Sequence, residues 1–223
     1  MKSMFILGDS ISKGVVLDEE KNRYKKIDES FSNILKDKLG FEVKNTGKFG
    51  ATVKKGVKIL DQNKAQLDEF DYTIIEFGGN DCNYTWSDVA NEPNKKHEAK
   101  VSLDEFEIIY EELVAEIIKT NTIPIVMTLP PLDSNRFFNW ISQGLEAKNI
   151  LEFMNFDVNA IAKWHENYNA IVEKIADKYN LKVCDVNKAF KEYKDGDLLC
   201  SDGMHPNEEG HKVIAESLIK IIA

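Results

Sequence analysis

Short apolar runs alternate along the chain with segments in which apolar residues recur every three or four positions. Runs rich in β-branched residues predict strands, and five are found, at Met4–Leu7, Phe41–Asn45, Tyr72–Phe77, Ile123–Thr128 and Leu181–Val186. Because helical segments separate the runs, we expect parallel strands joined by crossover helices. The pattern predicts an α/β fold, a three-layer α/β/α sandwich with a central, mainly parallel five-stranded sheet of the flavodoxin-like type.

The helical segments carry recognisable end signals. Gly40 follows one apolar stripe and is expected to end that helix in the left-handed conformation. Ser102, with Glu105 three residues later, forms a capping box that begins another helix. Further helices are expected to begin near Asp157 and Asn207.

Two segments, 82–101 and 130–156, break this regular alternation. Both follow strand ends on the edge of the sheet where ligands bind in open α/β folds. They contain Trp86, Phe137 and Trp140, which we interpret as candidate substrate-binding residues. We therefore expect these segments to form substrate walls or a lid within a single domain that covers residues 1–223.

Composition narrows the class of protein. With 223 residues, 43% of them hydrophobic and 30% charged, the chain is typical of one soluble globular domain. A net charge of −9 disfavours nucleic acid or an anionic membrane as partner. No signal peptide is expected before the first strand, and Cys82, Cys184 and Cys200 lack metal-type spacing, so we expect reduced thiols and a cytoplasmic location.

The candidate chemistry begins at Ser10, directly after the first predicted strand. A serine hydroxyl is a weak nucleophile and needs a neighbouring base, which in turn needs a group to orient it. Asp202 and His205 lie three residues apart before the last helix, so one compact turn can supply both groups. The order Ser, Asp, His is that of α/β hydrolases, although their Gly-x-Ser-x-Gly elbow is absent.

Acyl transfer also requires donors for the oxyanion of the tetrahedral intermediate. Asn80 follows Gly78 and Gly79 at a strand end, where its side-chain amide can face the site. The backbone N–H groups of Ser10 and Gly47 are the further candidates.

Together these segments resemble the four sequence blocks of the SGNH hydrolases, also called GDSL-type esterases or lipases. The blocks are Gly8-Asp9-Ser10-Ile11, Asn45-Thr46-Gly47, Gly78-Gly79-Asn80-Asp81 and Asp202-Gly203-Met204-His205-Pro206. The resemblance implies Ser10 as nucleophile, His205 as base and Asp202 as its orienting acid. It also implies an oxyanion hole formed by Ser10, Gly47 and Asn80. The glycine block matches most loosely, and Gly50 is the alternative to Gly47.

The expected activity is hydrolysis of carboxylic esters through an acyl-enzyme, without cofactor or metal. Short acyl groups are favoured, as in an acetylated carbohydrate, because no long apolar groove is evident from the sequence. A lysophospholipid or thioester with a longer acyl chain is the alternative substrate.

Two other classes remain open. One is a metal-dependent phosphoesterase, with ligands drawn from Asp9, Asn80, Asp202, His205 and His211, although no metal-binding motif is present. The other is a module that binds phosphate at a helix N-terminus without turning it over.

Three further polar residues receive simpler interpretations. Asp9 is expected to brace the serine turn, His211 to face solvent at the start of the last helix, and His165 to lie at the boundary of the long helix.

Overall fold

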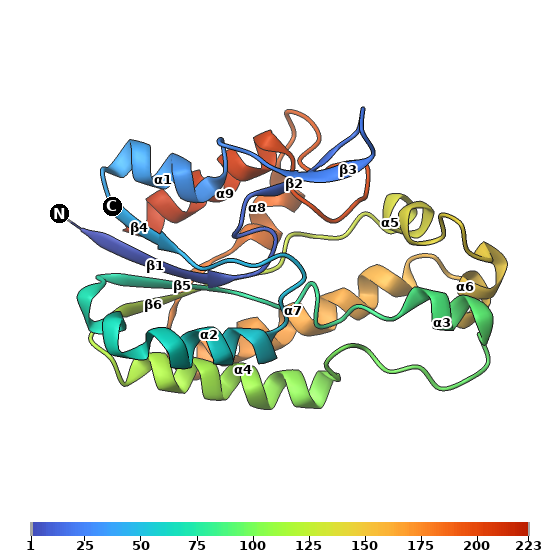
Figure 1. Ribbon diagram of the computed structural model, residues 1–223, viewed down its shortest axis with the longest axis horizontal. Coiled ribbons are helices and arrows are strands. Elements are labelled where there is room, and N and C mark those ends of the chain that lie inside the picture. The colour runs from blue at the N-terminus through green and yellow to red at the C-terminus, as the bar shows by residue number, and fades with distance from the viewer. Residues whose placement is uncertain (1, 223) are drawn as a thin grey trace.

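The computed structural model describes residues 2–222 and has one five-stranded parallel sheet at its centre (Figure 1). Its strands, in the spatial order β4-β1-β5-β6-β7, are β4 (Glu42–Asn45), β1 (Ser3–Gly8), β5 (Tyr72–Glu76), β6 (Ile123–Met127) and β7 (Lys182–Cys184). All five predicted strands are present, and every pairing between them is parallel. The predicted fold class is confirmed.

The sheet changes direction of winding at β1, which lies between β4 and β5. Met4 is in register with Val43 on one side and with Tyr72 on the other. All six residues of β1 are buried, as expected for a strand covered on both faces. Such a switch point opens a crevice at the carboxyl ends of the strands, and Ser10 follows β1 at this crevice.

Helices cover both faces of the sheet (Figure 1). One layer consists of α1 (Phe31–Leu39), α8 (Val186–Glu192) and α9 (Glu208–Ile222). The other consists of α2 (Val53–Asn63), the 3-10 helix η1 (Lys64–Glu69), α4 (Leu103–Ile118) and α7 (Ala160–Lys178). Gly40 ends α1 at φ 64°, as predicted. The Ser102 hydroxyl accepts the Glu105 N–H at 3.3 Å, which is one half of the predicted capping box, whereas the Glu105 carboxylate pairs with Lys54 at 2.7 Å.

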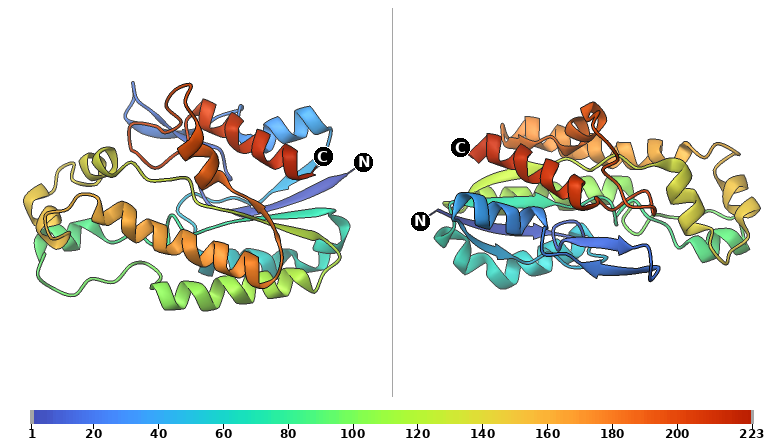
Figure 2. Two further views of the ribbon diagram at one scale, coloured as in Figure 1. Left: turned by 180° about the vertical axis from the view of Figure 1, so that it is seen from behind. Right: turned by 90° about the horizontal axis from the view of Figure 1, so that it is seen from above.

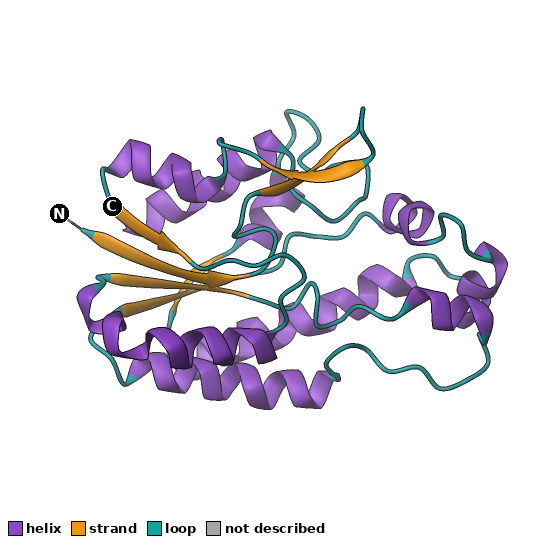
Figure 3. Ribbon diagram, viewed as in Figure 1, coloured by secondary structure: helices purple, strands orange, loops and turns teal. Residues whose placement is uncertain are grey.

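A two-stranded antiparallel hairpin was not expected from the sequence. It comprises β2 (Val15–Asp18) and β3 (Arg23–Lys26) and lies apart from the main sheet, above its carboxyl edge (Figure 3). Residues of β2 pack with Cys200, which precedes the Asp202–His205 turn. The hairpin therefore covers the candidate site.

The two irregular segments contain short helices that lie together beyond the carboxyl edge of the sheet (Figure 2). We call α3 (Trp86–Asn91), α5 (Ser134–Ile141) and α6 (Ala147–Phe153) the cap. They share an apolar cluster with the start of α7, and the Asn149 amide donates to Ala90 O at 2.7 Å.

Cys82, Cys184 and Cys200 are buried free thiols, as predicted. Within residues 2–222, no helix combines the length and apolar character needed to cross a membrane.

Candidate active site

The structure brings Ser10, His205 and Asp202 into one hydrogen-bonded chain. The Ser10 hydroxyl lies 3.0 Å from Nε2 of His205, and Nδ1 of His205 lies 2.6 Å from Oδ2 of Asp202. All three side chains are buried. This arrangement lets the imidazole accept the serine proton at Nε2 while the carboxylate holds the Nδ1 proton.

The Asp202–His205 turn has its own internal support. Oδ1 of Asp202 accepts the N–H groups of Met204 and His205 at 3.0 and 3.1 Å. Burial alone would raise the pKa of Asp202, but the hydrogen bond and charge of His205 and these N–H groups outweigh it, so this pKa lies below its usual value. The acid is therefore an anion at neutral pH, as an orienting group requires.

Asp9 braces the serine turn, as expected. Its Oδ1 accepts the Ile11 N–H at 2.8 Å, and its Oδ2 accepts the Asn80 amide at 2.7 Å. Asn80 thus uses one of the two hydrogens of its amide on Asp9 and keeps the other for a ligand. The amide is fixed beside Ser10.

The structure does not support Gly47 as an oxyanion donor. Its N–H is hydrogen-bonded to Oδ1 of Asn45 at 2.9 Å, and Gly47 is not among the residues that line the cavity beside Ser10. Gly50 does line that cavity, with φ at 70°. Within residues 2–222 the N–H groups of Gly50 and Ser10 donate no hydrogen bond, so both remain open to a substrate oxygen.

An apolar cavity of about 230 Å³ opens beside Ser10 and His205. Its lining includes six aromatic side chains, among them the predicted Trp86 and Phe137, with Tyr84 and Trp164 as well. The Trp86 indole donates to Asn83 at 2.7 Å and the Trp164 indole donates to Cys82 O at 2.9 Å. These bonds fix the orientation of both rings.

A second hollow, of about 180 Å³, lies next to this cavity and is lined by residues of α6 and α7. Four residues line both spaces: Tyr84, Trp86, Ile161 and Trp164. The cavity beside Ser10 and this hollow thus share a wall of aromatic and aliphatic side chains.

Trp140 does not line the cavity, contrary to the expectation that it binds substrate. Its ring packs against Tyr24, with centroids 5.7 Å apart. Tyr24 in turn lies 4.8 Å from the His205 ring, and Phe49, which packs on Tyr24 at 5.2 Å, stacks on the same imidazole at 6.4 Å. Trp140 thus supports the hairpin residue that covers the base.

Two histidines differ from their sequence interpretations. His165 is buried and lines the cavity, and burial lowers its pKa to about 4, so the ring is neutral. His211 does not face solvent but is fully buried, where Nδ1 accepts the Phe31 N–H at 3.4 Å. Helix α1 packs against the N-terminal turn of α9 and thereby encloses the His211 side chain.

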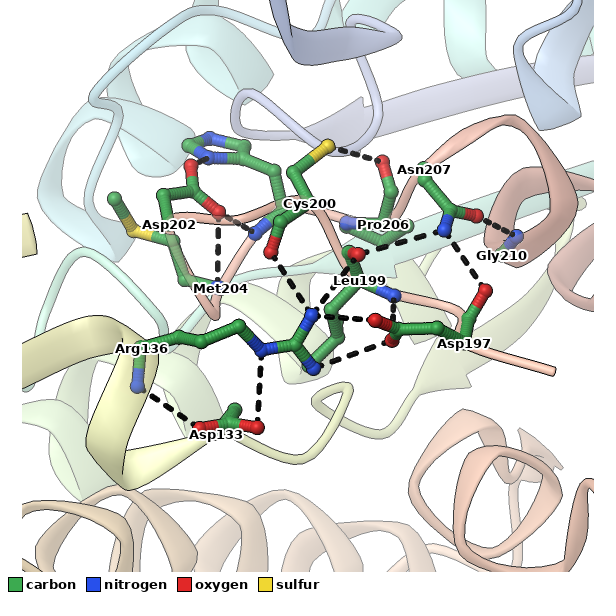
Figure 4. A network of polar contacts seen from close by, with 11 residues as sticks. Asp133, Arg136, Asp197, Leu199, Cys200, Asp202, Met204, Pro206, Asn207 and Gly210 are labelled. Atoms are coloured by element: carbon green, nitrogen blue, oxygen red, sulfur yellow. Dashed lines mark hydrogen bonds and ion pairs between the residues drawn. The ribbon is translucent and has the colours of Figure 1, made fainter. Parts of the chain in front are cut away.

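The Asp202–His205 turn, which we call the catalytic turn, is joined to the cap through Arg136 of α5 (Figure 4). Its guanidinium contacts Asp133 at 3.0 Å and Asp197 at 2.6 and 3.2 Å. Gly203 accommodates the close approach of α5, because a Cβ atom there would lie 2.7 Å from the Phe137 N atom. In the part of the chain that is described, no group of three or more His, Cys, Asp or Glu side chains is arranged to hold a metal ion.

The fold and the site define the chain as a serine hydrolase of the α/β/α sandwich class. A model of the GDSL-like lipase/acylhydrolase family matches residues 6–213, and the chain belongs to this family. No curated protein matches the sequence.

Similar solved structures share the fold. A lipase/acylhydrolase from Enterococcus faecalis is 22% identical, with a TM-score of 0.69 over 100% of this chain and 95% of that one. A catalytic mutant of an acetylxylan esterase from Geobacillus stearothermophilus is 21% identical, with a TM-score of 0.64 over 100% and 94%. A carbohydrate acetylesterase from Sinorhizobium meliloti is 15% identical, with a TM-score of 0.69 over 100% and 98%.

Proposed function

We propose that this enzyme hydrolyses carboxylic esters through an acyl-enzyme formed on Ser10. The observation that carries the proposal is the hydrogen-bonded chain from the Ser10 hydroxyl through His205 to Asp202, at the wall of an apolar cavity. His205 is oriented by an anionic carboxylate, and its Nε2 faces the hydroxyl that it must deprotonate.

In the first half of the reaction, His205 Nε2 takes the Ser10 proton as Oγ bonds to the ester carbonyl carbon. The carbonyl electrons move to oxygen, and the N–H groups of Ser10 and Gly50 with the Asn80 amide stabilise that oxyanion. When the oxyanion collapses, the C–O bond to the alcohol breaks and His205 returns its proton to the leaving oxygen. In the second half, His205 deprotonates water as it attacks the acyl carbonyl carbon, and His205 then returns that proton to Oγ as the bond to Ser10 breaks and the acid leaves.

The cavity supports an acyl chain of several carbons as the preferred group. The expectation of short acyl groups assumes that the site has no long apolar groove, whereas the apolar cavity beside Ser10 offers room for a chain of several carbons. Burying methylene groups there would contribute roughly 0.8 kcal/mol each.

An acetylated carbohydrate is the second candidate. Aromatic side chains next to Ser10 suit stacking on a sugar ring, and two of the similar structures are described as an acetylxylan esterase and a carbohydrate acetylesterase. In this case the aromatic cavity would hold the alcohol side of the ester.

A series of p-nitrophenyl esters from acetate to laurate, together with acetylated xylo-oligosaccharides, separates the candidates. A maximum of kcat/KM at an intermediate chain length supports the acyl cavity. A steady fall from acetate, with turnover of the oligosaccharide, supports the acetylesterase.

Replacing Ser10 or His205 by alanine should lower kcat by several orders of magnitude with every active ester, because neither residue works without the other. Inactivation by an organofluorophosphonate and indifference to chelator are expected of the serine mechanism. Loss of activity with chelator and recovery with Mn²⁺ or Zn²⁺ would instead support the phosphoesterase class.

A further inference from the structure

Glu76, the last residue of β5, lies buried beneath the serine turn. Its Oε2 accepts the N–H of Asp9 at 3.0 Å, the N–H of Ser12 at 3.3 Å and the hydroxyl of Ser12 at 2.8 Å. One carboxyl oxygen therefore gathers three donors from the residues on either side of Ser10.

Gly8 is the residue that makes room for this carboxyl group. A Cβ atom at position 8 would lie 2.2 Å from the Ser12 hydroxyl and 2.7 Å from Oε2 of Glu76. Since real Cβ atoms do not approach that closely, the glycine of the serine block and the buried glutamate belong to one packing arrangement. The turn that presents the nucleophile is built on Glu76.

A second buried carboxyl group, that of Asp9, adjoins Glu76, whose Oε2 accepts the Asp9 N–H at 3.0 Å. Within residues 2–222 neither group forms an ion pair with lysine or arginine. Burial raises the pKa of both, and the charge of Asp9 raises that of Glu76 further. Two adjacent buried carboxyls without a cation hold one proton between them.

The hydrogen bonds indicate where that proton resides. Both oxygens of Asp9 accept donors, from Ile11 N–H and from the Asn80 amide. Of the Glu76 oxygens, Oε2 accepts donors while Oε1 has no partner among N–H and O–H groups of the described residues. Oε1 is thus the atom free to carry a hydrogen, and Asp9 supplies the neighbouring carboxylate.

We propose that Glu76 is a positioning residue that stays protonated and donates to Asp9, which in turn orients the Asn80 amide for the oxyanion. The inference rests on the proposed ester hydrolysis. Glu76 does not touch substrate, and its effect reaches the reaction through Asp9 and Asn80. Its proton also limits the pair to one negative charge next to the place where the oxyanion forms.

This role makes activity depend on pH in a defined direction. Loss of the Glu76 proton adds a second negative charge beneath the oxyanion hole and removes the donor to Asp9, so kcat falls as pH rises through that ionisation. The other titratable groups around the pair are Asp81 after β5, Tyr110 on α4, Cys82 and His205. These residues remain in every Glu76 variant, and because Glu76 also acts on Tyr110 and Asp9, the profiles are compared for the loss of one whole ionisation.

Two variants and one control test the proposal with an ester that the parent hydrolyses. Glu76→Gln keeps an acceptor for Asp9 N–H and Ser12 and a permanent donor to Asp9. It should retain kcat at neutral pH within about threefold and lose the alkaline fall attributed to Glu76. Glu76→Ala should lower kcat about 10²-fold with little change in KM, the scale expected when a reacting group is misplaced.

Thr73→Val is the matched control, because Thr73 is also buried on β5 and its hydroxyl shares a hydrogen bond with Thr122 at 3.0 Å, away from the serine turn. It should lower thermal stability without changing kcat or the pH profile.

An alkaline profile of Glu76→Gln that coincides with that of the parent would overturn the inference, even if Glu76→Ala does not fold. So would parental kcat in a folded Glu76→Ala. A parent that hydrolyses no ester, or a Ser10→Ala variant that retains activity, would instead refute the proposed function, which keeps the two failures distinct.

Discussion

At the scale of single residues, the site depends on where Asn80 holds its amide. Asp9 fixes that amide at 2.7 Å, and the free hydrogen is left for the oxyanion. Asn80→Ala should lower kcat about 10²–10³-fold, since one preorganised donor is lost, while KM changes little. Steady-state kinetics with the best p-nitrophenyl ester measures both, and unchanged turnover would remove Asn80 from the oxyanion hole.

The same scale shows why some site residues could be predicted and others could not. Ser10, Asn80 and His205 stand in short segments that follow strands or precede a helix, so local sequence determines their place. Gly47 and Gly50 are both glycines of one loop, and only the folded loop shows that Asn45 occupies the N–H of Gly47. The proposed positioning role of Glu76 could not be predicted, because in the sequence this residue is simply the polar end of an apolar strand.

At the scale of elements, Asp81 joins the end of β5 to the start of α2. Its Oδ1 accepts the Val53 N–H at 2.9 Å, whereas its Oδ2 has no partner in the described chain. Burial raises the pKa of Asp81 to about 7, against the lowering effect of that N–H. The folded protein therefore keeps a proton that the unfolded chain releases near its ordinary pKa.

The contribution of Asp81 to the free energy of unfolding should consequently fall as pH rises from about 4 to about 7 and stay constant above that pH. The total fall is of the order of 4 kcal/mol. Asp81→Asn keeps the acceptor for Val53 and removes the ionisation. Its free energy of unfolding in urea should match that of the parent near about pH 4 and exceed it by about 1–4 kcal/mol near about pH 8. Equal stability at the alkaline pH would contradict the assignment.

Elements also differ in how well the sequence predicts them. The five sheet strands are buried apolar runs, and each was predicted. The hairpin was missed because β3, Arg23–Lys26, has three exposed charged residues and no apolar face. Its position depends on the packing of Tyr24 against Trp140 and His205, which are far away in sequence.

At the scale of the whole molecule, the central sheet positions Ser10 at its carboxyl edge, and the cap and the catalytic turn lie on either side of the cavity next to it. The sequence indicated that segments 82–101 and 130–156 lie at the active edge, but not that they pack on one another. That packing joins α3, α6 and the start of α7 around a shared apolar cluster. Non-local contacts of this kind leave no periodic signal in a single segment.

Arg136 is one link between the cap and the Asp202–His205 turn, beside the Asp133 N–H that donates to Gly203 O at 2.9 Å. It donates to both oxygens of Asp197 and approaches the carbonyls of Leu199 and Cys200 at 3.4 and 3.5 Å, just before Asp202. Arg136→Ala leaves Asp197 unpaired and loosens the catalytic turn. We expect kcat/KM to fall about tenfold through misplacement of His205, with a loss of about 1 kcal/mol in stability because the pair is partly exposed.

Arg136→Lys is the matched variant, because it keeps the charge but cannot make both contacts to Asp197. Its kcat/KM should lie between those of the parent and Arg136→Ala. The rate of Ser10 labelling by a small organofluorophosphonate distinguishes the possible causes. If Arg136 acts on the triad, labelling slows in parallel with ester hydrolysis. If it only shapes the cavity, labelling stays at the parental rate while KM for long-chain esters rises, which would confine the role of the cap to substrate binding.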